Sequence, residues 1–457
     1  MCTILVHKYT IKIQLLHLNQ PELFNEFSTI PTDKFEANCL YNLTINHFDL
    51  TFAVNYQIIL RIPIVYRSSI MAIQKTYEEI NEKIRRGEAV VLTAEEVSQM
   101  ALTATPEEIA ERVDVVTTAT FGAMCSSGAI VNFGHANPPI RMEKIRLNGV
   151  PAYEGLAAVD TYIGATACDP ENPKYGGAHV IQDLVDGKDI ELEAWGKGTD
   201  CYPRKHIKTM INKESVNEMI LFNPRNAYQN YNVAVNSTSQ MKYTYMGCLL
   251  PNMRNATYST SGELSPLLND PEMKTIGIGT RIFLGGTQGF VVWPGTQFNT
   301  SKPKNEFGVP VSNSATLAVM GNLKEMSSEF LQAAYYEKYG VSLFVGIGIP
   351  IPVLNADIAK NVSIRNEQIH TTVMDYGVEG TPVMGRVTYA ELRSGEIEVQ
   401  GKKIRTAPVS SLSKARKIAE LLKQSILAGE FEISKPVQMF PTNTSLKSLK
   451  ETKGGEQ

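Results

Sequence analysis

All 33 glycines of this 457-residue chain lie after residue 70. At an average usage of about 7%, a stretch of 70 residues contains about five glycines. The segment 1–70 therefore lacks the residue that tight turns use most, whereas the later sequence alternates glycine with short apolar runs. This distribution predicts a body of strands and tight turns after residue 70, preceded by an N-terminal extension of different character.

Three interpretations of the extension stay open: translated sequence upstream of a true start at Met71, a small genuine domain, or a targeting segment. The apolar run 57–66 is interrupted by Arg61 and is shorter than the ~20 residues that a membrane-spanning helix needs. It also lacks the flanks of a signal peptide. We expect a soluble, cytoplasmic protein with its functional domain at 71–440 and a polar C-terminal tail at 441–457.

Local patterns predict helices at both ends of this domain. Thr93-Ala-Glu-Glu96 and Thr105-Pro-Glu-Glu108 are capping boxes, each of which begins a helix. The segment 413–428 carries apolar residues at helical spacing and is followed by Gly429, a stop signal. Short apolar runs predict strands between these helices, at 276–284, 290–293 and 341–353, and a hairpin of 387–392 with 396–399. The expected class is mixed α and β, with glycine-rich strands and hairpins forming a large core.

Composition excludes several classes of function. The net charge of -3 gives no electrostatic attraction for nucleic acid or an anionic membrane surface. Six cysteines without a Cys-x-x-Cys pair argue against a disulfide scaffold, a zinc ribbon or an iron–sulfur cluster. The glycine clusters 277–289 and 346–350 resemble pieces of a dinucleotide fingerprint, but strands follow them instead of a helix N-terminus. We therefore expect no bound cofactor and no metal, and we interpret the glycines as tight turns and close packing.

Cys201 is the cysteine with the most positive charge nearby in sequence, in Trp195-Gly-Lys-Gly-Thr-Asp-Cys-Tyr-Pro-Arg-Lys-His206. Neighbouring cations lower the pKa of a thiol and favour the nucleophilic thiolate. The candidates for stabilising that thiolate are Arg204, Lys205 and His206. The competing interpretation, a buried inert cysteine beside a solvated basic run, stays open.

Cys125 is the second candidate nucleophile because glycine and serine surround it, in Phe121-Gly-Ala-Met-Cys-Ser-Ser-Gly128. Small neighbours leave room for a substrate and expose backbone N–H groups. Cys168 is interpreted as structural, and Cys248, in Met-Gly-Cys-Leu-Leu-Pro, has the most core-like setting. A zinc site drawn from Cys125, His135, Cys168 and His179 is the weaker alternative, because the spacings are irregular.

Four motifs in order give the chain a family resemblance. They are Phe121-Gly-Ala-Met-Cys-Ser-Ser-Gly-Ala-Ile, Ala152-Tyr-Glu-Gly-Leu-Ala-Ala-Val-Asp-Thr-Tyr-Ile-Gly-Ala-Thr, Lys174-Tyr-Gly-Gly-Ala-His179, and Trp195-Gly-Lys-Gly-Thr-Asp-Cys-Tyr-Pro-Arg. Together they resemble the homocysteine biosynthesis family of L-aspartate semialdehyde sulfurtransferases, over approximately 71–440. The resemblance implies formation of homocysteine from aspartate semialdehyde, a sulfur source and two electrons. It also implies that Cys201 carries a persulfide and that Cys125 is the second required cysteine.

This chemistry has further requirements. Electrons must come from outside the chain, and the resemblance implies a small ferredoxin-like iron–sulfur protein as the redox partner. The substrate carboxylate calls for an arginine fork, for which Arg254 and Arg281 are guesses. Self-association into a homo-oligomer stays open.

Two other classes of function also fit the residues. A cysteine hydrolase or acyltransferase would use a nucleophilic cysteine with a histidine held by Asn or Asp, and would need no electron donor. A non-catalytic metal- or metabolite-binding module would bind zinc stoichiometrically and would not depend on Cys201.

Overall fold

The computed structural model describes residues 2–7, 10–15 and 73–450. The chain divides into two units, 1–69 and 70–457. In the first unit, the described residues form an antiparallel hairpin of β1 (Cys2–His7) and β2 (Thr10–Leu15). The rest of the segment 1–70 lies outside the described residues, so the nature of the extension stays a prediction.

The largest sheet of the second unit has ten strands in the order β3-β4-β20-β16-β17-β18-β11-β5-β8, with β19 paired to β20. Its strands are β3 (Val91–Thr93), β4 (Val115–Ala123), β5 (Gly128–Asn132), β8 (Asp160–Gly164), β11 (Glu218–Asn226), β16 (Arg281–Leu284), β17 (Thr287–Pro294), β18 (Leu317–Asn322), β19 (Leu331–Tyr336) and β20 (Gly340–Pro352). β3 pairs with β4 in parallel, whereas β20 pairs with β4 antiparallel over nine residue pairs, from Phe344↔Ala123 to Pro352↔Val115.

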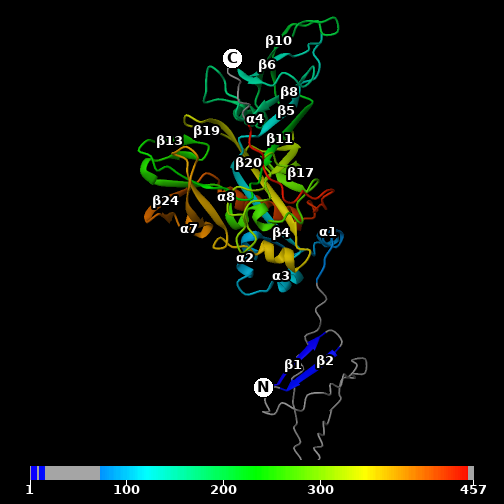
Figure 1. The fold of residues 1–457 in the computed structure, drawn as a ribbon. Helices are drawn as coiled ribbons and strands as arrows, with labels where there is room; N and C mark the ends of the chain where they lie inside the picture. The colour runs from blue at the N-terminus through cyan, green and yellow to red at the C-terminus, as the bar shows by residue number, and fades with distance from the viewer. Residues whose placement is uncertain (1, 8–9, 16–72, 451–457) are drawn as a thin grey trace, which may run out of the picture. The chain divides into compact units, whose positions relative to one another are not determined.

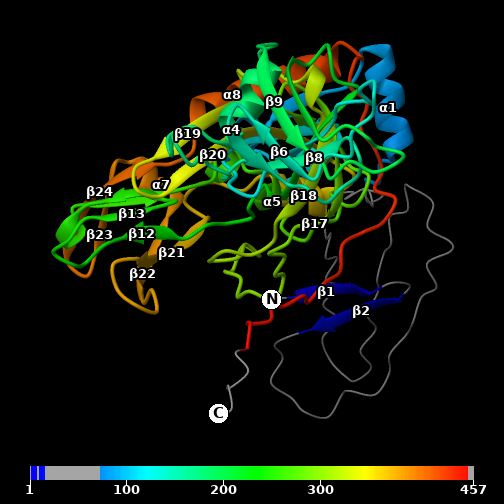
Figure 2. The same ribbon diagram turned by 90° about the horizontal axis from the view of Figure 1, so that it is seen from above.

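Two smaller sheets and a hairpin complete the β structure. A four-stranded sheet has the order β10-β9-β6-β7, with β6 (Lys144–Leu147), β7 (Val150–Ala152), β9 (Ile190–Trp195) and β10 (His206–Ile211). A six-stranded sheet has the order β22-β21-β12-β15-β24-β23, with β12 (Val233–Val235), β15 (Asn255–Tyr258), β21 (His370–Asp375), β22 (Val383–Thr388), β23 (Glu396–Val399) and β24 (Lys402–Pro408). β13 (Lys242–Thr244) and β14 (Gly247–Leu249) form the hairpin. Within the second unit, the six-stranded sheet gathers on the side opposite α1 (Figure 2).

The described helices are short apart from α8. They are α1 (Tyr77–Arg86), α2 (Ala94–Met100), α3 (Pro106–Arg112), α4 (Gly177–Val185), α5 (Pro266–Asn269), α6 (Ala356–Val362), α7 (Tyr389–Arg393) and α8 (Leu412–Leu427), with single 3₁₀ turns at η2 (Pro251–Met253), η3 (Gly262–Leu264) and η4 (Leu323–Glu325). None of the described helices is long and apolar enough to cross a membrane. The mixed α and β class is therefore confirmed.

The predicted terminal helices are confirmed by their caps. Thr93 and Thr105 each accept a hydrogen bond from the backbone N–H three residues on, and Glu96 and Glu108 complete the capping boxes of α2 and α3. α8 ends before Gly429, whose φ of 75° is the left-handed conformation that stops a helix.

α8 packs against β4 and β20 (Figure 1). Its buried residue Ile418 fits over two glycines of β20: a Cβ on Gly346 would lie 2.7 Å from Ile418 Cδ1, and one on Gly348 would lie 3.0 Å from its Cγ2. These glycines therefore serve close helix–sheet packing, as expected. Gly285 and Gly286, with φ of 62° and 107°, form the tight turn between β16 and β17.

Two strand predictions were wrong. The segment 387–392 does not pair with 396–399, because Thr388 and Glu391 form a capping box that begins α7. β23 pairs with β24 instead. Only the last part of 276–284 is a strand, because the backbone N–H groups of Thr275 and Ile276 donate to the buried carboxylate of Asp270, at 2.8 and 3.2 Å.

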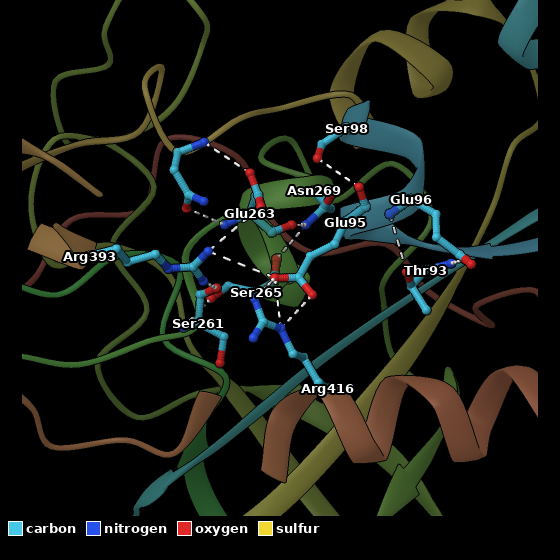
Figure 3. Close-up of polar contacts among 11 residues, drawn as sticks. Thr93, Glu95, Glu96, Ser98, Ser261, Glu263, Ser265, Asn269, Arg393 and Arg416 are labelled. Atoms are coloured by element: carbon cyan, nitrogen blue, oxygen red, sulfur yellow. Dashed lines mark hydrogen bonds and ion pairs between the residues drawn. The ribbon is translucent and has the colours of Figure 1, made fainter. Parts of the chain in front are cut away.

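An ionic network joins α2, α7 and α8 (Figure 3). Arg416 of α8 donates hydrogen bonds from Nε and Nη2 to the two oxygens of the Glu95 carboxylate, at 2.8 and 2.9 Å. From the other side, Arg393 of α7 lies 3.9 Å from Glu95 and 3.6 Å from Glu263. Burial raises the pKa of the Glu263 carboxyl, and Arg393 limits that rise. The network therefore links α7, which lies in the chain between β22 and β23 of the six-stranded sheet, to α2 and α8.

Candidate active site

Cys125 lies in the turn that connects β4 to β5 in the ten-stranded sheet. The N–H and the hydroxyl of Ser127 both donate to the carbonyl of Met124, at 3.0 and 2.7 Å, so the turn is held from inside. The thiol is partly buried, and its sulfur lies 3.2 Å from the hydroxyl of Ser342, a fully buried residue of β20. The long β4–β20 pairing thus positions Cys125.

Tyrosines surround this sulfur. The Tyr339 hydroxyl points at Cys125 Sγ from 3.9 Å. Burial raises the pKa of Tyr336 to about 12, and the nearby Cys125 adds to the rise. The pKa of Tyr339 is also raised, first by burial and then by Cys125. These phenols are therefore protonated near neutral pH and can donate hydrogen bonds toward the cysteine.

The tyrosines continue outward as one connected cluster. Successive ring centroids lie 4.8 to 6.3 Å apart, and the Tyr245 and Tyr376 hydroxyls are 2.9 Å apart. The members are Tyr228, Tyr231, Tyr245, Tyr336, Tyr339 and Tyr376, and we call them the tyrosine cluster. Their positions in the sequence span 228–376, so no local pattern pointed to them.

Cys201 lies at the tip of the β9–β10 hairpin in the four-stranded sheet. Thr199 and Tyr202 exchange backbone hydrogen bonds of 2.9 and 3.1 Å, which leaves Asp200 and Cys201 as the two central residues of a tight turn. The thiol is exposed, and the hydroxyl of Thr199 lies 3.5 Å from its sulfur. The interpretation of Cys201 as a buried cysteine was therefore wrong.

The basic residues that follow Cys201 have other partners. Arg204 donates from Nη2 to the carbonyl of Asn137 at 2.7 Å, and His206 Nε2 lies 3.1 Å from the Glu193 carboxylate. The aliphatic part of Lys205 packs by Gly198, where a Cβ would lie 2.8 Å from Lys205 Cε. Within the described chain, no hydrogen bond joins any of the three side chains to the Cys201 sulfur. Their role as thiolate stabilisers stays a prediction.

A hollow of about 290 Å³ opens beside Tyr202, the residue after Cys201. Its lining includes the segment 154–158, which belongs to the second motif of the family resemblance, together with Arg141 and Glu143. The Tyr202 ring also stacks with His135, with centroids 6.1 Å apart. Two of the motifs therefore meet next to the hairpin tip.

The guessed carboxylate ligands lie in other surroundings. Arg254 is exposed after η2, and the Arg281 guanidinium lies 5.8 Å from the ring centroid of Phe431. Neither is hydrogen-bonded to a group beside the two cysteines in the described chain. The sequence analysis missed a third arginine, Arg225. Burial raises the pKa of Tyr228 to about 12. Arg225 lowers this pKa, whereas Cys125 raises it.

The structure also bears on the interpretations of Cys248 and Cys168 and on the alternative zinc site. Cys248 is exposed, so its core-like interpretation was wrong: the side-chain alternation of β14 buries Leu249 instead. Cys168 is partly buried at the edge of the main core, which fits a structural role. His179 Nδ1 accepts from the Gly176 N–H at 3.2 Å, and the described residues contain no group of three or more side chains able to hold a metal.

The sequence is similar to proteins of known family. The model of the family described as homocysteine biosynthesis enzyme, sulfur-incorporation, matches residues 89–433. The chain belongs to this family. The matched region includes both cysteine turns and the tyrosine cluster.

Two relatives carry the name L-aspartate semialdehyde sulfurtransferase. The one from Methanosarcina acetivorans is 50% identical over 83% of this chain and 75% of its own length. The one from Methanocaldococcus jannaschii is 51% identical over 80% of this chain and 73% of its own length. A third relative, from Methanothermobacter thermautotrophicus, is described as uncharacterized and is 28% identical over 70% of this chain. No solved structure matches the chain significantly.

Proposed function

We propose that this protein converts L-aspartate semialdehyde to L-homocysteine, with Cys201 as the sulfur carrier and Cys125 as the second thiol. Membership of the family and the two relatives with that name support the overall reaction. The observation that carries the division of roles is the contrast in exposure: Cys201 is open at a hairpin tip, and Cys125 is partly buried among hydroxyl groups. We also place the reaction in the cytoplasm.

In the first step, the Cys201 thiolate takes the outer sulfur of a sulfane donor and becomes a persulfide, and the rest of the donor leaves as a thiolate. A thiolate at an exposed turn can meet a small donor or another protein directly. The terminal sulfur then attacks the aldehyde carbon, so that a carbon–sulfur bond forms and the carbonyl electron pair moves to oxygen. The oxygen takes a proton from water, and the product is a hemithioacetal linked to Cys201 through a disulfide.

In the second step, the Cys125 thiolate attacks the Cys201 sulfur. The bond between Cys201 and the added sulfur breaks, the hemithioacetal leaves as a thiolate, and a Cys125–Cys201 disulfide forms. Loss of water gives a thioaldehyde, and two electrons with two protons reduce it to the thiol. If sulfide reopens the disulfide to give the next persulfide, the whole cycle needs two electrons, whereas a sulfane donor needs two more to reduce the disulfide.

These electrons come from outside the chain in our proposal. No bound cofactor is needed for the sulfur steps, and a small ferredoxin-like iron–sulfur protein is the proposed donor. Both cysteines are free thiols, and no hydrogen bond joins their sulfurs in the described chain. The cycle therefore requires the hairpin tip to approach the Cys125 turn, within one chain or between copies in a homo-oligomer.

The cysteine hydrolase is the second candidate, and the geometry favours it less. A hydrolase needs a histidine within hydrogen-bond reach of the nucleophile. In the described chain, the two sulfurs have hydroxyl groups as their hydrogen-bond partners, those of Ser342, Tyr339 and Thr199.

Anaerobic incubation with aspartate semialdehyde, a sulfane donor and a low-potential reductant tests the proposal, and a second series uses sulfide as the donor with protein that starts as the Cys125–Cys201 disulfide. We expect homocysteine, identified by mass spectrometry, only when all three are present. Formation of an acid or an amide product without the reductant would support the hydrolase instead, and absence of homocysteine with every donor tried would contradict the proposed reaction.

A further inference from the structure

A β-bulge lies close to the Cys125 turn, at the end of β11. Asn223 is opposite Val319 of β18, but Asn226 is opposite Leu317, so β11 has one more residue than its partner over this interval. Bulges of this kind turn a side chain away from the regular alternation of the sheet, and they are common beside active sites. Here the bulged segment contains Pro224 and Arg225.

The side-chain amide nitrogen of Asn223, next to the Cys125 turn, has no hydrogen-bond partner in the described chain. Its Oδ1 accepts hydrogen bonds from the Arg225 N–H at 2.9 Å and from the Ser126 hydroxyl at 3.4 Å. The backbone donor fixes the orientation of the amide, because only oxygen can accept there. The side chain is fully buried, and Nδ2 has no hydrogen-bond partner in the described chain. A buried donor without a partner is uncommon and calls for a ligand or a functional explanation.

Arg225 brings a positive charge to the same place. Its Nε donates to the Thr296 hydroxyl at 3.2 Å, and no ion pair with a carboxylate of the described chain is found for it. Burial raises the pKa of the Tyr228 hydroxyl to about 12, and of its charged neighbours Arg225 lowers this pKa while Cys125 raises it. By contrast, Arg393 and Arg416 are neutralised by Glu95 and Glu263 (Figure 3).

We propose that Arg225 and Asn223 are the substrate-recognition residues next to Cys125. Arg225 binds the α-carboxylate of a small amino-acid aldehyde, and the Asn223 amide donates to the aldehyde oxygen. This inference rests on the proposed function for the identity of the aldehyde. An arginine fork matches a carboxylate, and an N–H aimed at a carbonyl oxygen stabilises the charge that forms there when sulfur attacks carbon.

The first test does not depend on homocysteine formation. It compares the alkylation rates of Cys125 with iodoacetate, which carries a carboxylate, and with neutral iodoacetamide, followed by mass spectrometry of the Cys125 peptide. Arg225→Gln should lower the iodoacetate-to-iodoacetamide rate ratio by about tenfold. Arg112→Gln, which removes an exposed arginine of α3 at the opposite end of β4 from Cys125, is the matched control and should leave the ratio unchanged. An unchanged ratio in Arg225→Gln overturns the assignment of Arg225.

The second test uses steady-state kinetics. Arg225→Gln should raise KM for aspartate semialdehyde by about 10- to 100-fold, with partial recovery in Arg225→Lys. Asn223→Ala should lower kcat by about 10²-fold with a smaller effect on KM. Thermal melting checks that Asn223→Ala is folded, and Asn223→Ser, which keeps a donor, should retain more activity than Asn223→Ala. Equal kcat in Asn223→Ala and the parent protein overturns the role of Asn223.

The two tests together separate this inference from the proposed function. If the parent protein makes no homocysteine but the alkylation ratio depends on Arg225, the proposed reaction fails and the carboxylate site stands. If homocysteine forms and neither the ratio nor KM responds to Arg225→Gln, the reaction stands and this inference fails.

Discussion

The Cys125 turn and the Cys201 turn hold their sulfur atoms in opposite ways. Cys125 is partly buried between two strands of the largest sheet, with Ser342 3.2 Å away and tyrosines around it. Cys201 is exposed at the tip of a hairpin, in a turn with two central residues, and its sulfur lies 3.5 Å from the Thr199 hydroxyl. One thiol is thus open to solvent and the other is partly enclosed, a contrast that agrees with the two roles that we propose for them.

Replacing each cysteine by serine is expected to have the largest effect. Cys201→Ser and Cys125→Ser should each lower homocysteine formation by at least about 10³-fold, because each removes a thiol that forms a covalent bond in the cycle. After incubation with a sulfane donor, the Cys201 peptide should gain the mass of one sulfur, about 32 Da, in the parent protein and in Cys125→Ser. Persulfide on Cys125 in the Cys201→Ser protein would reverse the two roles.

Alkylation rates test whether the two turns differ in the reactivity of their thiols. Cys201 should react with iodoacetamide about tenfold faster than Cys168, which is only partly exposed. Cys248 is the control for access, because it is exposed like Cys201 but lies in another hairpin. Faster labelling of Cys201 than of Cys248 is the expected result. Equal labelling of the two would show that exposure alone sets the rate and would remove the role of Arg204, Lys205 and His206.

Alanine at one glycine of each region should give unequal losses of stability. A Cβ on Gly128, at the base of the Cys125 turn, would lie 2.2 Å from the ring of Tyr162 on the neighbouring strand. Gly128→Ala should therefore lower the free energy of unfolding by about 1–3 kcal/mol.

Gly198 in the Cys201 hairpin has φ of 74°, and its nearest obstacle is the flexible side chain of Lys205. Gly198→Ala should cost about 1 kcal/mol, from the left-handed backbone alone. Urea denaturation of both variants measures the difference. A larger loss for Gly198→Ala would mean that the hairpin tip is packed more tightly than the Cys125 turn.

Removal of residues 1–70 is expected to have the smallest effect on either region. The family match covers residues 89–433, which include both cysteine turns. A chain that starts at Met71 should melt within about 2 °C of the full chain and keep its activity. A large fall in melting temperature would show that the extension supports the rest of the protein.

Structure determined by local contacts was predictable from the sequence. The capping boxes at Thr93 and Thr105 gave the starts of α2 and α3, because the cap and its partner are three residues apart. The same rule, applied to Thr388 and Glu391, would have prevented the incorrect hairpin at 387–399. Neighbours in sequence likewise singled out Cys125 and Cys201 as candidates, and their roles stay predictions.

The features of the site that the sequence did not predict depend on contacts between distant segments of the chain. The carboxylate partner of His206 is on the neighbouring strand, so the sequence around Cys201 could not show which groups the following basic residues contact. Arg225 became a candidate only through a bulge that is defined by pairing with β18. The tyrosine cluster draws on loops and strands from 228 to 376, and only the fold brings those rings together.

The open position of Cys201 also has a chemical cost. A thiol that any sulfur donor can reach is equally within reach of peroxide and other oxidants. Oxidation first gives a sulfenic acid, which thiols can reverse, and then a sulfinic acid, which ordinary reductants cannot. If Cys201 carries the sulfur as we propose, its exposed hairpin makes lasting activity depend on surroundings that are poor in oxygen.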